Sequence, residues 1–138
     1  MAEPVRPLVR PRRLVPGDRV VVVAPSGSVP ADRLHLGCGI LRSWGLDVEV
    51  APHVLGVHPE LRYLAGTDAD RARDLEQAWL DPGVAAVVCA RGGYGVQRLV
   101  DLLDWEAMRA VPPKVLVGYS DVTALHEAFA VRLGLATV

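Results

Sequence analysis

The chain has 138 residues, of which 51% are hydrophobic and 22% charged, so it has enough apolar material for one folded domain. The formal net charge of −1 gives no indication of nucleic-acid binding. No apolar run approaches the roughly 18 residues that a membrane span needs, and the Pro- and Arg-rich start lacks the apolar centre of a secretory signal. We therefore expect a cytoplasmic protein without nucleic-acid or membrane partners.

Strand and helix signals alternate along the chain. Residues 1–17, rich in proline and arginine, are expected to form a flexible lead-in to a domain that spans residues 18–138. Beyond it, β-branched runs without alternation predict buried strands, and apolar residues at helical spacing predict helices. In chain order the expected elements are a strand at 19–24, a helix at 31–44, a strand at 46–51, a helix from 67 or 68 to 80, a strand at 84–90, helices at 97–103 and 105–109, a strand at 114–118, a helix at 120–133 and the start of a strand at 135–138.

This alternation predicts an α/β fold with a Rossmann-like open parallel sheet and helices on both faces. The chain stops at residues 135–138, inside what reads as a buried strand. We therefore expect the sheet to be truncated in its last strand and the sequence to be a fragment of a longer protein.

A serine follows the fourth predicted strand. In parallel α/β sheets, ligands gather at the carboxyl ends of the strands. The sequence Gly118-Tyr119-Ser120-Asp121 places Ser120 on a sharp strand-to-helix turn, where its hydroxyl would stand above the sheet edge. The backbone N–H of Asp121 would then face an oxyanion formed beside Ser120. The same residues also suit an ordinary helix start, with Ser120 as cap and Asp121 facing the helix dipole.

A glycine-rich loop follows the third predicted strand. Three glycines in Arg91-Gly92-Gly93-Tyr94-Gly95 allow the backbone to approach a ligand closely. The spacing fits neither a P-loop nor a dinucleotide-binding fingerprint, and a tight turn explains it as well. Arg91 is the more informative residue, because a guanidinium binds carboxylates through two hydrogen bonds.

The histidines give little support for a general base. His126 follows Ser120 by six residues on the same predicted helix, about 600° of rotation at ~100° per residue, so it is predicted to turn away from Ser120. His53 and His58 lie in a strand-end loop, where histidines are more often surface residues than catalytic ones. No pair of residues has metal-ligand spacing, and no metal is expected.

Taken in order, these motifs resemble the N-terminal domain of the LD-carboxypeptidases, the family of the murein tetrapeptide carboxypeptidases and microcin C immunity peptidases. The similarity runs from about residue 14 to residue 138. It is carried by Pro16-Gly17-Asp18, Val23-Ala24-Pro25-Ser26-Gly27, Tyr63-Leu64-Ala65-Gly66-Thr67-Asp68, Arg91-Gly92-Gly93-Tyr94-Gly95 and Gly118-Tyr119-Ser120-Asp121-Val122-Thr123.

The resemblance implies a serine hydrolase without metal or cofactor that cleaves an amide between an L- and a D-centre, typically releasing terminal D-alanine from a murein tetrapeptide. Ser120 would be the nucleophile. The oxyanion donors would be the N–H of Asp121 and one from Gly92 or Gly93. Arg91 and Tyr94 are our candidates for substrate contact, on chemical grounds.

The resemblance also implies that the general base, a histidine oriented by a glutamate, lies in a C-terminal domain absent from this chain. Since a serine hydroxyl is a poor nucleophile without a base, we expect this chain alone to be nearly inactive. Family members are often homodimers, so self-association is expected as well. The substrate could equally be a microcin-like acyl nucleotide conjugate.

Two other functions stay open from the residues. The first is a Rossmann-like module that binds a nucleotide or sugar phosphate through the Arg91–Gly95 loop, although no acidic residue closes a second strand as ribose recognition would need. The second is a non-catalytic, truncated domain that binds peptides without cleaving them.

Overall fold

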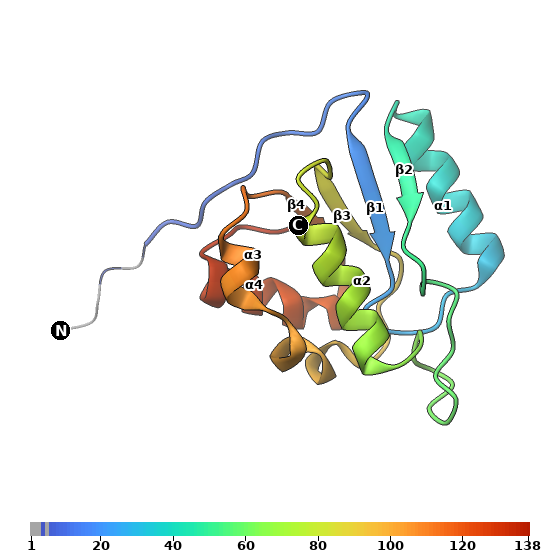
Figure 1. The fold of residues 1–138 in the computed structure, drawn as a ribbon. Helices are drawn as coiled ribbons and strands as arrows, with labels where there is room; N and C mark the ends of the chain where they lie inside the picture. Colours follow the sequence, from blue (N-terminus) through green and yellow to red (C-terminus); the bar gives the residue numbers. More distant parts are fainter. Residues whose placement is uncertain (1–3, 5) are drawn as a thin grey trace.

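The protein is described here from a computed structural model that covers residue 4 and residues 6–138. Its centre is one parallel sheet of four strands in the order β2–β1–β3–β4 (Figure 1). Val22 of β1 pairs with Val50 on one side and Val88 on the other, and Val88 pairs in turn with Val117. The strands are β1 (Arg19–Val23), β2 (Asp47–Val50), β3 (Ala86–Cys89) and β4 (Val115–Val117).

Helices cover both faces of the sheet, as the sequence predicts. Helix α1 (Ala31–Ser43) packs on one face, where Cys38 meets Val20 and Val22 of β1. The other face carries α2 (Asp68–Leu80), α3 (Trp105–Arg109) and α4 (Thr123–Leu133), as Figure 1 shows. The prediction of an α/β fold with a flanked parallel sheet is therefore confirmed.

The larger core lies under α2, α3 and α4. Phe129 of α4 is fully buried, and the rings of Trp79 and Trp105 meet it edge-on with centroids 4.8 and 5.5 Å away. Each indole N–H is paired with a backbone carbonyl, those of Met108 and Val100 respectively. Such edge-to-face packing fixes the three helices against the sheet and so anchors the loops at its edge.

Two predicted helices are more irregular than expected. The segment 97–103 forms two short 3₁₀ turns, η1 (Val96–Arg98) and η2 (Val100–Leu102). The predicted helix 120–133 begins with a 3₁₀ turn, η3 (Ser120–Val122), before α4. Such 3₁₀ turns are common as connectors and at the ends of α-helices.

The predicted fifth strand does not form as a continuous element. Leu135 makes an isolated parallel bridge with Val9, and the Val138 N–H donates to the Leu116 carbonyl beside β4 at 2.9 Å. The Val138 carbonyl in turn accepts from the Gly118 N–H at 2.9 Å, so the end of the chain is bonded to β4 and its following loop while Leu135 pairs with Val9. Val9 belongs to the predicted lead-in 1–17, of which residues 1–3 and 5 lie outside the described residues.

Candidate active site

Three loops meet at the carboxyl edge of the sheet. They are the β1 loop (residues 25–27), the glycine loop after β3 (residues 91–95) and the elbow after β4 (residues 118–121). Because β1, β3 and β4 are parallel neighbours, their carboxyl ends lie side by side. The Gly27 N–H donates to the Gly92 carbonyl at 3.1 Å, which joins the first two loops directly.

Ser120 holds an unusual backbone conformation at the elbow. Its φ is 62°, and it is the one non-glycine residue with positive φ in the described part of the chain. The left-handed conformation costs an ordinary residue about 1–2 kcal/mol. The turn is also crowded: a Cβ on Gly118 would lie 2.5 Å from Cγ1 of Val122. Such strain at a strand-to-helix turn is typical of an exposed nucleophile and is not required of a simple cap.

The structure brings Gly92 to Ser120. A Cβ on Gly92 would lie 2.9 Å from the Ser120 Cβ and 3.2 Å from its Oγ. Gly93, with φ of 122°, instead faces the β1 loop, since its Cβ would lie 3.2 Å from the Gly27 Cα. Within the described residues, the N–H groups of Gly92, Gly93 and Asp121 donate no hydrogen bond. They are thus free to serve a ligand, and Gly92 is the closer of the two glycines to Ser120.

The side chain of Asp121 links the elbow to the β1 loop and to Val96, the first residue after the glycine loop. Its Oδ2 accepts a hydrogen bond from the buried Ser26 hydroxyl at 2.6 Å and another from the Val96 N–H at 3.1 Å. The sequence indicated the backbone N–H of Asp121 and an interaction of its charge with the helix dipole, but neither the Ser26 hydroxyl nor the Val96 N–H as a partner. No spacing rule connects residues 95 positions apart, so the contact could not be predicted before the fold.

Arg91 and Tyr94 flank the glycine loop on its exposed side. The Arg91 Nη1 donates to the Ser28 carbonyl at 2.5 Å. Tyr94 is half exposed, and its ring lies against that of Tyr63 with the centroids 6.0 Å apart. Both side chains can reach a bound molecule, Arg91 through its remaining N–H groups and the tyrosines through ring faces and hydroxyls.

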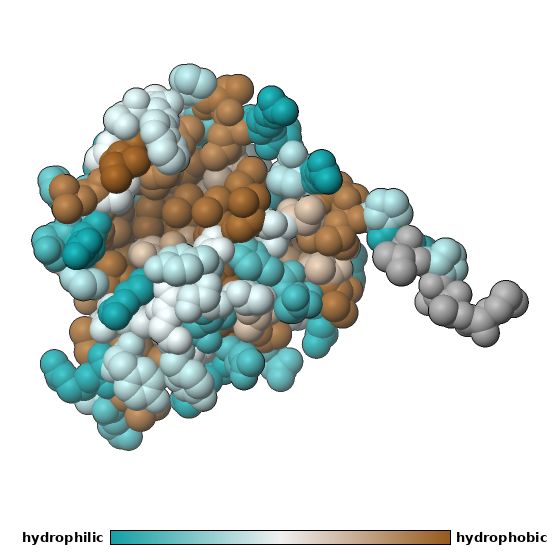
Figure 2. All heavy atoms as spheres, turned by 180° about the vertical axis from the view of Figure 1, so that it is seen from behind, coloured by the Kyte–Doolittle hydropathy of each residue, from teal (hydrophilic) through white to brown (hydrophobic). Residues whose placement is uncertain are grey.

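An apolar cleft of about 590 Å³ opens beside the elbow, between α1 and the sheet. Figure 2 shows apolar side chains gathered around this hollow on the side opposite to the view of Figure 1. Arg91 and Tyr119 line it, and they adjoin in the chain Gly92 and Ser120, which lie against each other. Cys89 also lines the cleft, where burial raises the pKa of its thiol to about 12, so it stays protonated and a poor nucleophile.

Three of the four histidines have partners other than Ser120. His126 returns toward the elbow, and its Nε2 lies 2.8 Å from the Gly118 carbonyl while its Nδ1 lies 2.5 Å from the Thr137 hydroxyl. Both ring nitrogens are therefore occupied. His53 pairs with Asp74, and the Nδ1 of His58 accepts from the N–H groups of Glu60 and Leu61. No hydrogen bond among the described residues joins a histidine to Ser120.

Arg71 is a buried charge behind the site that sequence reasoning missed. It is 1% exposed and donates to carbonyls of two strand-end loops. A signal existed: Arg71 precedes Leu75 and Ala78 by four and seven residues, so it falls on the apolar stripe of α2. A charge in that position is unusual and indicates a specific partner in the folded state.

Within residues 4 and 6–138, no helix is both long and apolar enough to cross a bilayer. In the same residues, no three His, Cys, Asp or Glu side chains are grouped as metal ligands.

The fold and the strained serine define a class: a parallel α/β domain that presents a serine on a strand-to-helix elbow above a glycine loop. Residues 20–138 match the family model of the LD-carboxypeptidase N-terminal domain. The chain belongs to the LD-carboxypeptidase family.

Related proteins agree with this assignment. A protein of Streptomyces coelicolor named as a candidate carboxypeptidase is 70% identical over 133 residues, covering 96% of this chain and 43% of the relative. The murein tetrapeptide carboxypeptidase of Pseudomonas aeruginosa is 39% identical over 111 residues, covering 80% of this chain and 35% of the relative. A crystal structure of an MccF-like protein from Bacillus anthracis superposes with a TM-score of 0.84 at 32% identity, covering 94% of this chain and 39% of that one. The chain therefore spans about two fifths of the length of these proteins.

Proposed function

We propose that this chain is the nucleophile-bearing domain of a serine LD-carboxypeptidase that acts on cytoplasmic murein peptides. Ser120 attacks the carbonyl carbon of the amide that precedes a terminal D-alanine, and its proton passes through the general base to the nitrogen of the departing D-alanine. Water then hydrolyses the acyl-serine ester and frees Ser120. The observation that carries the proposal is the left-handed conformation of Ser120 directly beside Gly92. Family membership favours this activity over nucleotide binding by the glycine loop.

The surrounding groups suit this reaction. The N–H groups of Asp121 and Gly92 lack partners among the described residues and would stabilise the negative charge that develops on the substrate oxygen. Arg91, at the border of the cleft, would pair with the carboxylate of the terminal D-alanine. Tyr94 would pack against the peptide together with Tyr63.

We propose that the general base lies outside these residues, and the proposal is supported by the partners of His53 and His126, which are groups other than Ser120. The family resemblance implies a histidine and a glutamate in a second domain. The relatives are long enough to carry one, since the matched segment covers only 43% of the Streptomyces coelicolor protein. The 138-residue chain on its own is expected to show almost no turnover.

The test is a fusion of residues 1–138 to the part of the Streptomyces coelicolor relative that follows its matched segment. Release of D-alanine from an L,D-tetrapeptide is measured for the fusion, for the fusion with Ser120→Ala and for the unfused chain. We expect turnover only in the unaltered fusion. A folded fusion that binds the tetrapeptide without cleaving it would support the non-catalytic alternative, and cleavage that survives Ser120→Ala would remove Ser120 as the nucleophile.

A further inference from the structure

A buried arginine joins two of the active-site loops from behind. The Nη1 of Arg71 donates to the Pro25 carbonyl of the β1 loop at 2.6 Å and to the Gly95 carbonyl of the glycine loop at 3.0 Å. The two acceptors are 70 residues apart in sequence, whereas one nitrogen atom reaches both. Arg71 is therefore a second cross-link between the two loops, on the side opposite to the hydrogen bond between Gly27 and Gly92.

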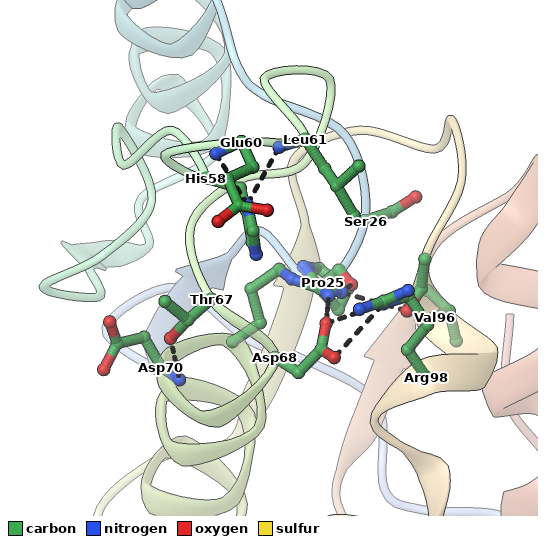
Figure 3. Close-up of polar contacts among 12 residues, drawn as sticks. Pro25, Ser26, His58, Glu60, Leu61, Thr67, Asp68, Asp70, Val96 and Arg98 are labelled. Atoms are coloured by element: carbon green, nitrogen blue, oxygen red, sulfur yellow. Dashed lines mark hydrogen bonds and ion pairs between the residues drawn. The ribbon is translucent and has the colours of Figure 1, made fainter.

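An acidic residue at the start of α2 holds the guanidinium in place. Asp68 accepts from Nη2 of Arg71 and from Nε of Arg98 at 2.9 Å, and Figure 3 shows its carboxylate between Pro25 and Arg98. The hydrogen bond from Arg98, followed by the charge of Arg71, keeps the pKa of Asp68 below its ordinary value, so the carboxylate stays charged at neutral pH.

This arrangement is poorly explained by stability alone. The Arg71 side chain is fully buried, and its Nε has no hydrogen-bond partner within the described residues. Burying a charge is costly, and a well-packed apolar side chain in its place is often as stable or more so. A buried, incompletely paired charge therefore calls for a specific role in the native state.

The glycine loop shows what the cross-link positions. Gly95 has a φ of 118°, and a Cβ there would lie 2.5 Å from Cδ2 of Leu64 and 3.2 Å from Nη1 of Arg71. At the other end of the same loop, Gly92 touches Ser120 and its carbonyl accepts from Gly27. Fixing Gly95 and Pro25 relative to each other thus sets where Gly92 lies against Ser120.

We propose that Arg71 is a positioning residue of the active site, whose buried guanidinium ties the β1 loop to the glycine loop and so holds the Gly92 N–H beside Ser120. Arg71 does not touch the substrate. It acts by restricting the motion of the loops that contact the substrate. An oxyanion site needs such rigid loops, because its hydrogen-bond donors must be in place before the reaction. The catalytic part of this inference rests on the proposed function, whereas the loop cross-link does not.

The first test uses the 138-residue chain and needs no activity. Arg71→Met is compared with Arg73→Met, a matched change on the same helix at an exposed side chain whose one ion pair, with Asp70, is at 3.6 Å. Amide hydrogen exchange is followed at Gly27 and Val96, whose N–H groups are bonded across the loops. We expect both amides to exchange about tenfold faster or more in Arg71→Met, while Val21 and Val87 in the sheet change little. Unchanged exchange at Gly27 and Val96 in a folded Arg71→Met chain overturns the proposal.

The second test uses the fusion. Arg71→Met should lower kcat by about 10²-fold with little change in KM, because the donors are misplaced while the substrate contacts remain. Arg71→Lys should restore part of the kcat, since an ammonium can reach one of the two carbonyls, and Arg73→Met should leave kcat unchanged. An unchanged kcat in Arg71→Met contradicts the positioning role. An inactive unaltered fusion would count against the proposed function alone, and the exchange measurement would still decide the cross-link.

Arg71→Met could fail to fold, and Asp68→Asn then takes its place. Asp68 is 28% exposed in its side chain, so its replacement leaves the core intact but removes the anion that holds the guanidinium. We expect the same two amides to exchange faster, by a smaller factor. A folded Asp68→Asn chain with unchanged exchange at Gly27 and Val96 would also refute the cross-link.

Discussion

Ser120 combines a side chain suited to catalysis with a backbone conformation that its own stereochemistry disfavours. The left-handed region brings the Cβ too close to the following carbonyl oxygen in any residue but glycine. Serine at this position therefore stores conformational energy that the surrounding contacts of Gly92 and Val122 must offset. A glycine would be the choice for stability, and the presence of serine indicates that the hydroxyl is needed.

This strain can be measured as a difference in the free energy of unfolding between two variants of Ser120. Ser120→Gly should be more stable than Ser120→Ala by about 0.5–1 kcal/mol, since relief of a 1–2 kcal/mol left-handed penalty is partly cancelled by the greater freedom of glycine in the unfolded chain. Urea unfolding of the native chain and of the two variants measures this difference in stability. An alanine variant as stable as the glycine variant would show that the elbow is not strained.

Gly134 supplies the matched control for this prediction. It ends α4 with a φ of 67°, and a Cβ there would meet nothing within 4 Å. Gly134→Ala therefore tests the left-handed penalty without any clash and should destabilise the protein by about 1 kcal/mol. If Gly134→Ala leaves the free energy of unfolding unchanged, the backbone at positions of positive φ relaxes without cost. A small difference between Ser120→Gly and Ser120→Ala would then say nothing about strain at the elbow.

At the scale of elements, an Asp–His pair fastens the loop after β2 to the middle of α2. Asp74 is buried and accepts from the backbone N–H of His53 at 2.9 Å and from its Nδ1 at 2.7 Å. Asp70 lies 3.7 Å from Nε2 of His53, and its negative charge raises the pKa of that histidine. The positive charge of Arg73, on the same helix, lowers it. The hydrogen bond to Asp74 is the main reason why the pKa of His53 is raised above its ordinary 6.5.

This pair should make stability depend on pH. Because the folded state raises the pKa of His53, its contribution is complete below pH 6.5 and is lost as the pH rises through the folded-state pKa. The difference in unfolding free energy between the native chain and His53→Gln should therefore shrink as the pH is raised above 6.5. Urea titrations of both proteins at a series of pH values measure this difference. A difference that grows with pH would have the wrong sign for this pair.

The elements that could be predicted from the sequence are those that depend on neighbouring residues, and those that depend on distant contacts could not. The strands and the helices α1 and α2 were found within one or two residues, because apolar periodicity and caps such as Thr67 are local signals. The sequence predicted one helix where the two 3₁₀ turns lie and a strand at 135–138, where Leu135 instead pairs with the distant Val9. The sequence indicated Ser120 and either Gly92 or Gly93. It placed Arg71 on the apolar stripe of α2 but gave no indication of its carbonyl partners, which lie in two distant loops.

At the scale of the whole molecule, the two faces of the sheet are covered unequally. Three helices bury one face, whereas α1 alone covers the other and lies against β1 and β2. Val88 and Val115 on this side remain partly exposed, and the apolar cleft opens over this part of the sheet (Figure 2). An apolar hollow of this kind on a folded domain is a surface that other apolar groups will bind.

The cleft should bind an apolar dye, and a charge introduced at Ile40 should prevent this binding. Ile40 lines the cleft and is 55% exposed, whereas Val131 of α4 is 79% exposed and does not line it. Fluorescence of anilinonaphthalene sulfonate should rise with the native chain, fall sharply with Ile40→Asp and stay unchanged with Val131→Asp, because a carboxylate in the cleft repels the anionic dye and makes the lining polar. Near-ultraviolet circular dichroism of each protein shows that the dye reports a native surface and not a loosened core. Equal dye binding by both aspartate variants would mean that the dye does not bind in the cleft. The part of the sheet that α1 leaves uncovered would then be less accessible than its exposed side chains indicate.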